Sequence, residues 1–280
     1  MSKVLITGSS GFVGKNLVRR LEEKSHEVLQ IDAEYFQFSD WPLYLNQQLE
    51  SSECKVIFHV GACSDTLEKN VQFMMERNYQ STKVISDWCR RKRIPLIYSS
   101  SAANLGVNGQ YPSNLYGWSK YVAEDYVISN GGIALRYFNV FGPGEEHKGS
   151  MASFLYQALI KLRESQLVKL FPKEPRRDFV YIDDVISANI FAFENFDKLD
   201  KNYYEVSTGI ASRFERVLEI ANIKFEYSSE KEIPEGYQFY TCGNPERWMP
   251  GWQPKFSLES GVIDFLSKLS DSIDGRESQT

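Results

Sequence analysis

The sequence predicts an α/β fold, in which a doubly wound parallel sheet carries a smaller C-terminal lobe. Short apolar runs alternate with amphipathic stretches up to about residue 141, and a segment rich in proline and aromatic residues follows. Strands that alternate with helices form βαβ units, whose parallel strands are buried on both faces of the sheet. A chain of 280 residues is long enough for one elaborated domain or two unequal lobes.

The expected strands are short and strongly apolar. They cover residues 4–6, 28–31, 56–60, 96–98 and 133–138. Helical patterns separate most of them, notably at residues 15–24, 81–93 and 115–127. Two later strand-like runs, residues 179–182 and 203–206, are expected to rejoin the main sheet. We therefore assign residues 1–141 plus 178–207 to the sheet domain, and residues 142–177 plus 208–280 to the smaller lobe.

The composition argues against several classes of protein. The net charge is −5 and no basic block occurs, so we expect no nucleic-acid partner. No apolar run approaches the ~20 residues that span a bilayer, so we expect no membrane partner. The four cysteines are scattered without a CxxC pair, which is typical of reduced thiols in the cytoplasm. The three histidines show no HExxH spacing, and we expect no metal site.

A glycine pattern follows the first expected strand. The stretch "VLITGSSGFVG" places Gly8, Gly11 and Gly14 three residues apart, leading into the first helix. Such glycines permit a tight turn, a close approach of the backbone to a pyrophosphate, and close packing of helix against strand. The phosphates then lie at the positive end of the helix. The pattern predicts a Rossmann-type dinucleotide site, and the alternative is a loop that only turns the chain.

An acidic residue ends the second expected strand. Asp32 comes 18 residues after Gly14 (32 − 14 = 18) and can accept hydrogen bonds from the adenosine ribose, although it could also be a cap or a solvated turn residue. Ala33 and Glu34 follow it, so the adjoining sequence offers no cation for a 2′-phosphate, which favours NAD over NADP. Small residues that can lie against adenine or ribose end the third expected strand: Val60, Gly61, Ala62 and Cys63.

A serine, a tyrosine and a lysine form the expected catalytic set. Ser101 ends a strand, and "YGWSK" places Tyr116 and Lys120 four residues apart, on one face of a helix. A tyrosine of pKa ~10 is a poor base at neutral pH, but a neighbouring ammonium group and a positive nicotinamide favour the phenolate. Lys120 can also bind the nicotinamide ribose, and Ser101 the reacting oxygen. A YxxxK pair alone is more often structural; the glycine turn and the strand-end serine favour the chemical interpretation.

The segments "TGSSGFVG", "SSSAANLG" and "YGWSK" resemble the extended short-chain dehydrogenase/reductase family. The resemblance implies a Rossmann lobe that binds NAD(P) and a C-terminal lobe that binds a nucleotide-sugar. Dehydratases of this family carry carboxylates just after the catalytic serine or threonine. Ala102 and Ala103 occupy those places here, which argues against dehydration and leaves epimerisation or simple oxidation and reduction.

Longer segments narrow the resemblance. "RYFNVFGPGEEHKGSMASF", "RRDFVYIDDV", "GYQFYT" and "HVGACSDT" are similar to the ADP-L-glycero-D-manno-heptose 6-epimerases. That family oxidises and re-reduces one sugar carbon, and the resemblance implies that Lys148 is a second acid/base, facing Tyr116 across that carbon. Lys148 could instead clamp a phosphate or be a solvated loop lysine. We expect Ser150 to cap the helix that runs to about Glu164.

The resemblance also implies further contacts. The expected cofactor contacts are Phe12, Val13, Asn78 and Val140. The expected substrate contacts are Asn139, Ser150, Gln157 (where the family has a histidine), Phe171, Arg177 and Tyr237. Arg177 would pair with the ADP diphosphate, or else form an ion pair with Asp178 or Glu174, and Tyr237 could equally belong to the core.

The predicted function is therefore that of a cytoplasmic nucleotide-sugar epimerase, acting at carbon 6 of an ADP-linked heptose, with a bound cofactor that is regenerated in each cycle. The family implies NADP, through an asparagine and a lysine that follow its acidic residue, whereas Ala33 in this chain favours NAD. The alternatives are a 4-epimerase or reductase acting on a UDP- or GDP-hexose, and a non-catalytic NAD(P)-sensing protein. We also expect a homo-oligomer.

Overall fold

A computed structural model describes residues 1–106, 111–234 and 237–277, with side chains up to residue 269. Its centre is a six-stranded sheet in which every neighbouring pair of strands is parallel, as the sequence predicts. The order across the sheet is β2 (Glu27–Ile31), β1 (Lys3–Thr7), β3 (Val56–His59), β4 (Leu96–Ser101), β5 (Ile133–Tyr137) and β9 (Tyr203–Val206).

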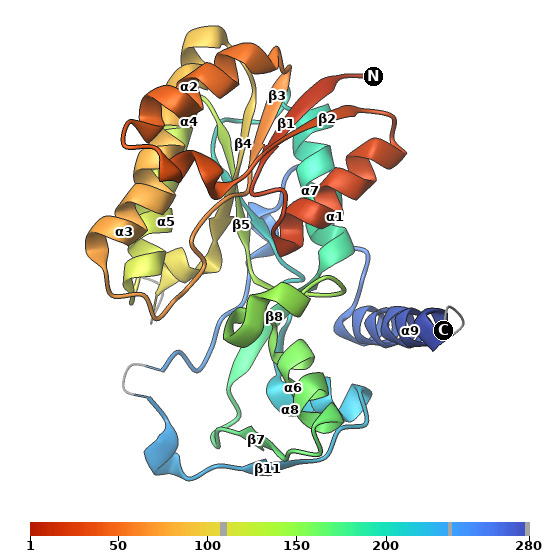
Figure 1. The fold of residues 1–280 in the computed structure, drawn as a ribbon. Helices are drawn as coiled ribbons and strands as arrows, with labels where there is room; N and C mark the ends of the chain where they lie inside the picture. Colours follow the sequence, from red (N-terminus) through yellow and green to blue (C-terminus); the bar gives the residue numbers. More distant parts are fainter. Residues whose placement is uncertain (107–110, 235–236, 278–280) are drawn as a thin grey trace.

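Helices cover both faces of this sheet (Figure 1). One face carries α1 (Phe12–Glu23) and α7 (Ile182–Glu194). The other carries α2 (Trp41–Ser52), α4 (Ser81–Lys92) and α5 (Leu115–Ser129). A short helix, α3 (Val71–Met75), runs through a π-helical turn, η2 (Glu76–Gln80), directly into α4.

The alternation of side chains along the strands explains why both faces are buried. In β1, Val4 and Ile6 belong to the hydrophobic core beneath α1 and α7, whereas Leu5 belongs to the core beneath α2 and α4. Phe58 and Ile57 divide between the same two cores in β3. Successive residues of a strand point to opposite faces, so a continuous apolar run fits a sheet that is covered twice.

The sheet is narrow on one side. In the common doubly wound order, a further strand lies outside the second one. Here β2 is the edge, and the chain passes directly into a 3₁₀ helix, η1 (Ala33–Gln37), and then into α2. This short path places aromatic residues of η1 just beyond Asp32.

The smaller lobe is built around two small sheets, one of which takes β6 (Asn139–Phe141) and most of β8 (Arg176–Tyr181) from residues assigned above to the sheet domain. This sheet has the order β10 (Ala211–Arg213), β8 and β6, and the other pairs β11 (Phe225–Tyr227) with β7 (Val168–Leu170). Its helices are α6 (Phe154–Arg163), α8 (Phe214–Ile220) and α9 (Leu258–Glu277). The remaining short helices are η3 (Ala102–Leu105), η5 (Glu146–Met151), η6 (Glu230–Glu232) and η7 (Pro245–Arg247). Within the described residues, none of the helices is both long and apolar enough to cross a membrane.

Only one of the two late strands rejoins the main sheet. The expectation is confirmed for β9, which pairs with β5, but it is wrong for β8, which pairs with β6 and β10. The reason is that β6 continues beyond the end of β5 and offers β8 a parallel partner outside the main sheet. The chain then returns to that sheet through α7.

A buried ion pair joins α5 to the sheet. Glu124 accepts hydrogen bonds from the Arg136 Nε (2.8 Å) and from the Ser100 Oγ (2.6 Å), and both charged side chains are almost fully buried. The Arg136 guanidinium carbon also lies 3.5 Å from the ring centroid of Tyr203. Because Glu124 lies one turn after Lys120 on α5, this pair holds the helix of the expected catalytic residues against β4 and β5.

We expect Arg136→Met to destabilise the protein strongly. The change leaves the buried Glu124 carboxylate without its cation, which typically costs about 3–5 kcal/mol. Urea unfolding followed by circular dichroism measures the loss. Arg216→Met is the matched control, because Arg216 is about half exposed and pairs with Glu219 and Glu259 on the surface, so its loss should cost less than about 1 kcal/mol. Equal losses for the two variants would contradict the assignment.

Candidate active site

A cavity of about 630 Å³ lies beyond the carboxyl ends of the central strands. It borders the reversal of strand order between β1 and β3, where open α/β sheets bind ligands. Many residues expected at the site line it together. These are Gly8, Gly11, Phe12, Val13, Asp32, Val60, Gly61, Ala62, Cys63, Tyr116, Lys120 and Lys148.

The glycine turn has no room for side chains at two positions. A Cβ on Gly8 would lie 2.6 Å from the Gly61 nitrogen and would overlap the Gly61 Cα, and Gly8 also has a φ of +69°. A Cβ on Gly14 would overlap the Gly8 carbonyl oxygen. Gly14 does not line the cavity, so its role is the close packing of α1 against the turn. This geometry fits a site where a dinucleotide pyrophosphate approaches the backbone.

Asp32 is held at the wall of the cavity. Its carboxylate accepts hydrogen bonds from the Ser9 Oγ (2.8 Å) and from the Ser10 backbone N–H (3.2 Å), which fixes it beside the glycine turn. A carboxylate has about four acceptor positions, so capacity remains for the hydroxyl groups of a ribose.

The Asn78 side chain holds the backbone of Cys63, which lines the cavity. The Asn78 side chain accepts a hydrogen bond from the Cys63 N–H (2.7 Å) and donates to the Cys63 carbonyl (2.9 Å) and the Ser119 Oγ (2.9 Å). Asn78 is buried and is not among the residues that line the cavity. Asn78 therefore supports the end of β3 and α5, and its expected contact with the cofactor stays a prediction.

Tyr116 and Ser101 come together from different elements. Asn114 caps α5 by accepting a hydrogen bond from the Gly117 N–H (2.7 Å), which begins the helix one residue before Tyr116. The Ser101 hydroxyl is in hydrogen-bond contact with the Tyr116 phenol. Burial raises the pKa of Tyr116 above its ordinary value, the Ser101 hydrogen bond opposes the rise, and Cys63 adds to it. In the protein without a dinucleotide, desolvation is the largest influence on this pKa; the expected lowering by Lys120 together with a positive nicotinamide stays a prediction.

Lys120 is a buried amine beside an aromatic ring. Its Nζ lies 4.3 Å from the ring centroid of Tyr98, and the residue is 2% exposed. Burial lowers the pKa of Lys120 to about 7, against a raising effect from Glu124. Glu124 is already committed to Arg136, so it does not neutralise the lysine directly. Near neutral pH this amine can therefore gain or lose a proton.

A neutral histidine lies under Lys120. His59 is buried between the Thr7 Oγ1 (2.6 Å from its Nδ1) and the Thr82 Oγ1 (2.8 Å from its Nε2). Burial, followed by the nearby Lys120 charge, lowers the pKa of His59 to about 3. His59 is therefore uncharged at neutral pH and joins β1, β3 and α4 below the cavity.

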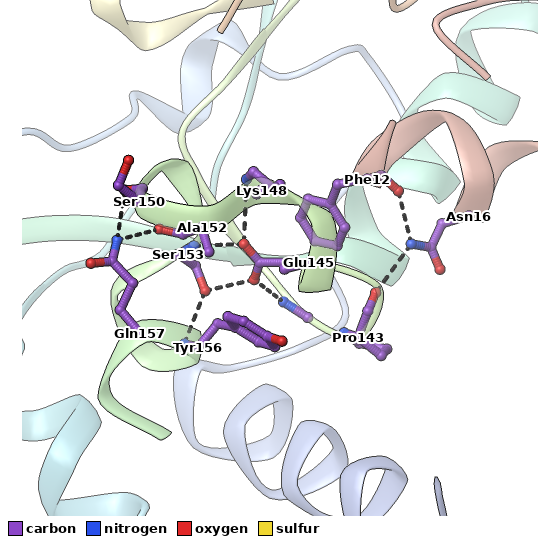
Figure 2. A network of polar contacts seen from close by, with 11 residues as sticks. Phe12, Asn16, Pro143, Glu145, Lys148, Ser150, Ala152, Ser153, Tyr156 and Gln157 are labelled. Atoms are coloured by element: carbon purple, nitrogen blue, oxygen red, sulfur yellow. Dashed lines mark hydrogen bonds and ion pairs between the residues drawn. The ribbon is translucent and has the colours of Figure 1, made fainter. Parts of the chain in front are cut away.

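Lys148 is fixed by a carboxylate that the sequence analysis did not single out (Figure 2). Glu145 is fully buried, and it accepts hydrogen bonds from the backbone N–H and the hydroxyl of Ser153, both at 2.6 Å. The Lys148 Nζ lies 3.3 Å from this carboxylate and 4.9 Å from the ring centroid of Phe12. The alternative of a solvated loop lysine is thus wrong. In the sequence, the position of Glu145 three residues before Lys148 was the feature that could have indicated this ion pair.

Lys148 borders two cavities. Besides the large one, it lines a cavity of about 210 Å³ together with Asn139, Val140 and Met151. Met151 also lines both cavities. Val140, expected at the cofactor, therefore faces the smaller cavity instead, because it lies on β6 beyond the end of the main sheet. Lys148 thus lies where a ligand in one cavity can meet a ligand in the other.

The loop after Lys148 differs from the expectation. Ser153, and not Ser150, caps α6 by accepting a hydrogen bond from the Tyr156 N–H (3.3 Å). Gly149 leaves the helical path at a φ of +52°, so the helix begins later. Gln157 donates to the carbonyl oxygens of Ser150 and Ala152 and braces the loop (Figure 2). Ser150 and Gln157 line neither of the two cavities that meet at Lys148.

The residues expected at the nucleotide form a separate cluster in the smaller lobe. The rings of Phe171 and Tyr237 meet edge to face at 5.1 Å, and the Arg177 guanidinium carbon lies 5.4 Å from the Tyr237 ring centroid. The alternative ion pairs of Arg177 do not form. Glu174 pairs with Arg176 and Arg213, and Asp178 accepts hydrogen bonds from the backbone N–H groups of Thr208, Gly209 and Gly243.

A glycine turn, Tyr116 and Lys120 around one cavity, with Ser101 hydrogen-bonded to Tyr116, define a protein of the NAD(P)-dependent short-chain dehydrogenase/reductase class. The model of the NAD dependent epimerase/dehydratase family matches residues 4–207. This chain belongs to that family.

Similar proteins support this membership. The chain is 33% identical to the ADP-L-glycero-D-manno-heptose-6-epimerase of Brachyspira hyodysenteriae and 30% identical to that of Alkalilimnicola ehrlichii, and each match covers 96% of this chain and 98% of the relative. The structure resembles the Helicobacter pylori ADP-L-glycero-D-manno-heptose-6-epimerase with a TM-score of 0.82, at 30% identity and 96% coverage of both chains. The Thermotoga maritima UDP-glucose 4-epimerase shares the fold, with a TM-score of 0.81 at 21% identity over 96% of this chain and 99% of that chain.

The buried Lys120 predicts a pH dependence of stability. Below about pH 7 the amine is protonated in the folded and unfolded states, and its burial costs stability in full. Between about 7 and the ordinary value of 10.5, the unfolded state binds more protons, so the free energy of unfolding rises with pH. We expect the wild type to gain about 2 kcal/mol relative to Lys120→Met between pH 7 and pH 9, measured by urea unfolding. An exposed control, Lys92→Met, should keep the wild-type slope; a Lys120→Met variant with that same slope would contradict the assignment.

Proposed function

We propose that this chain catalyses the 6-epimerisation of an ADP-linked glycero-manno-heptose, with a tightly held NAD(P) cofactor. The observation that carries the proposal is that Tyr116 and Lys148, two groups able to exchange protons, line one cavity together with the glycine turn. An enzyme that inverts a carbinol carbon handles protons on both faces of that carbon, and this cavity offers one group from each lobe. The named relatives support the choice of substrate.

The glycine turn, Asp32 and the small residues at the end of β3 would hold the dinucleotide. Bound NAD(P) supplies a hydride acceptor that becomes a hydride donor, so the cofactor is regenerated in each cycle. Lys120 orients the nicotinamide ribose and places a titratable amine on the same face of α5 as Tyr116. Gly8 and Gly61 carry no side chains at this close backbone contact, so the pyrophosphate could approach the main chain there.

The side chains then divide the proton transfers. Tyr116 receives the proton of the sugar hydroxyl when the carbon is oxidised to a ketone, and Ser101 donates a hydrogen bond to the same oxygen. The ketone then rotates within the site. Lys148 delivers a proton to the ketone oxygen when hydride is returned to the opposite face of the sugar carbon. Glu145 anchors the amine for this role, because the carboxylate is itself held by Ser153.

The substrate would extend into the smaller lobe. Arg177 is free of carboxylate partners within the described ion pairs, and its planar fork suits the diphosphate. Phe171 and Tyr237 would hold the nucleotide, while Asn139, Ser150 and Gln157 would contact the sugar. This assignment makes residues 142–177 plus 208–280 the nucleotide-sugar lobe. A cytoplasmic homo-oligomer is part of the same proposal, and light scattering after size-exclusion chromatography tests the oligomer.

The decisive experiment incubates the purified protein with each ADP-heptose epimer separately and follows carbon 6 by NMR. The proposal expects the same equilibrium mixture from both epimers, without net change in the absorbance of reduced cofactor. Conversion of only a UDP- or GDP-hexose would indicate a different epimerase. Stoichiometric use of cofactor would indicate a reductase, and stabilisation by NAD(P) without any turnover would indicate a sensor.

We expect Lys148→Met and Tyr116→Phe each to lower kcat by about 10²- to 10⁴-fold, because each removes a positioned acid/base. The rate of epimer conversion by NMR measures the effect. Lys92→Met is the control, since Lys92 pairs with Glu50 on the outer face of α4. If Lys148→Met retained at least a third of the wild-type kcat, Lys148 would not be the second acid/base.

A further inference from the structure

An arginine lies in the cofactor cavity at the end where the adenosine ribose would bind. Arg77 lines the cavity together with Asp32, Ala33, Tyr35 and Phe36. Its guanidinium carbon lies 3.7 Å from the Phe36 ring centroid, and its Nε is buried without a hydrogen bond to the residues that the structure describes. Arg77 is in none of the ion pairs between described residues, so its guanidinium is available to an anionic ligand in this cavity.

The local backbone explains how Arg77 reaches this place. Arg77 and Asn78 are consecutive residues of the π-helical turn η2, and Asn78 points into the protein to hold Cys63. On the other side of Arg77, the Glu76 carboxylate accepts a hydrogen bond from the Trp41 Nε1 (2.8 Å) and is thereby engaged by α2. The side chains of Glu76, Arg77 and Asn78 therefore leave the π-helical turn in different directions, and that of Arg77 enters the cavity.

The short path after β2 completes the arrangement. Because β2 is the edge strand, η1 begins at once after Asp32 and brings Phe36 under the guanidinium. Tyr35 lies within electrostatic reach of both Arg77 and Asp32, so the cation and the carboxylate stand at the same end of the cavity. Adjacent residues in the sequence, Ala33 and Glu34, suggested that no cation was near. That expectation is wrong, because the cation comes from 45 positions further along (77 − 32 = 45).

We propose that Arg77 determines cofactor specificity by binding the 2′-phosphate of NADP. A guanidinium group offers two parallel N–H donors to a phosphate, and Phe36 holds its plane in place. Asp32 serves the ribose hydroxyls of NAD, so the site accepts both dinucleotides and Arg77 shifts the preference toward NADP. The proposal depends on the cavity's binding a dinucleotide and is independent of the sugar, so it survives if ADP-heptose proves to be the wrong substrate.

The test measures dissociation constants of NADP⁺ and NAD⁺ by calorimetry, without sugar. Arg77→Met should raise the dissociation constant of NADP⁺ by about 10- to 100-fold, since a charged hydrogen bond contributes about 1.5–3 kcal/mol. The dissociation constant of NAD⁺ should change by less than threefold. The dissociation constant of NADP⁺ for Arg77→Lys should lie between those of Arg77→Met and the wild type. Arg90→Met is the matched control, because Arg90 is an exposed residue of α4 outside the cavity. Equal weakening of both dinucleotides, or no weakening of either, overturns the proposal.

A second measurement decides the matter even if Arg77→Met does not fold. The wild type should bind 2′,5′-ADP at least tenfold more tightly than 5′-AMP, because the two ligands differ only by the 2′-phosphate. Arg77→Lys, which keeps the charge, should reduce this ratio. A ratio near one for the wild type overturns the proposal.

Discussion

The backbones of β1 and β3 meet at their carboxyl ends so closely that Gly8 and Gly61 leave no space for a side chain between them. The rest of the site depends on this contact. It forms the floor of the cavity at the reversal of strand order, and it directs the turn so that α1 starts with Phe12 facing the smaller lobe. The same helix binds that lobe, since the Asn16 amide donates to the Pro143 carbonyl (3.3 Å). A side chain at Gly8 would therefore disturb both the dinucleotide site and the position of Lys148.

The cations at the site are stabilised in different ways, and these differences separate their roles. Arg136 has a buried carboxylate and keeps its charge, which suits a purely positioning role. Lys148 also has a carboxylate, but its amine remains at the border of two cavities. Lys120 lies over the face of Tyr98 and forms no ion pair with a carboxylate among the described residues, and burial brings its pKa to about 7. The lysine without a carboxylate in contact is thus the one whose protonation can change near neutral pH.

Sequence reasoning succeeded where the structure is local. The glycine turn and helices α4 and α5 follow from patterns of neighbouring residues, and they stand within a few residues of their expected positions. Sequence reasoning failed where distant segments compete for a partner, and where one glycine redirects the chain before a helix. β8 joins β6 because that strand continues past the main sheet, and Ser153 replaces Ser150 as a cap because Gly149 redirects the chain. The sequence also did not show that Asn78 supports Cys63 or that Val140 lines the smaller cavity, since the direction of these side chains depends on elements far away in the sequence.

The sequence by itself determined the class of the site, because the turn residues and the tyrosine–lysine spacing act over a few positions, where geometry is set by the helix and strand periods. Only the tertiary structure decided how charged groups are grouped and buried. It paired Lys148 with a fully buried Glu145, desolvated Tyr116 and Lys120, and brought Arg77 next to Asp32. The physical reason is that desolvation and electrostatic interaction depend on distance in space, and segments far apart in the chain supply most of the surroundings of each buried charge.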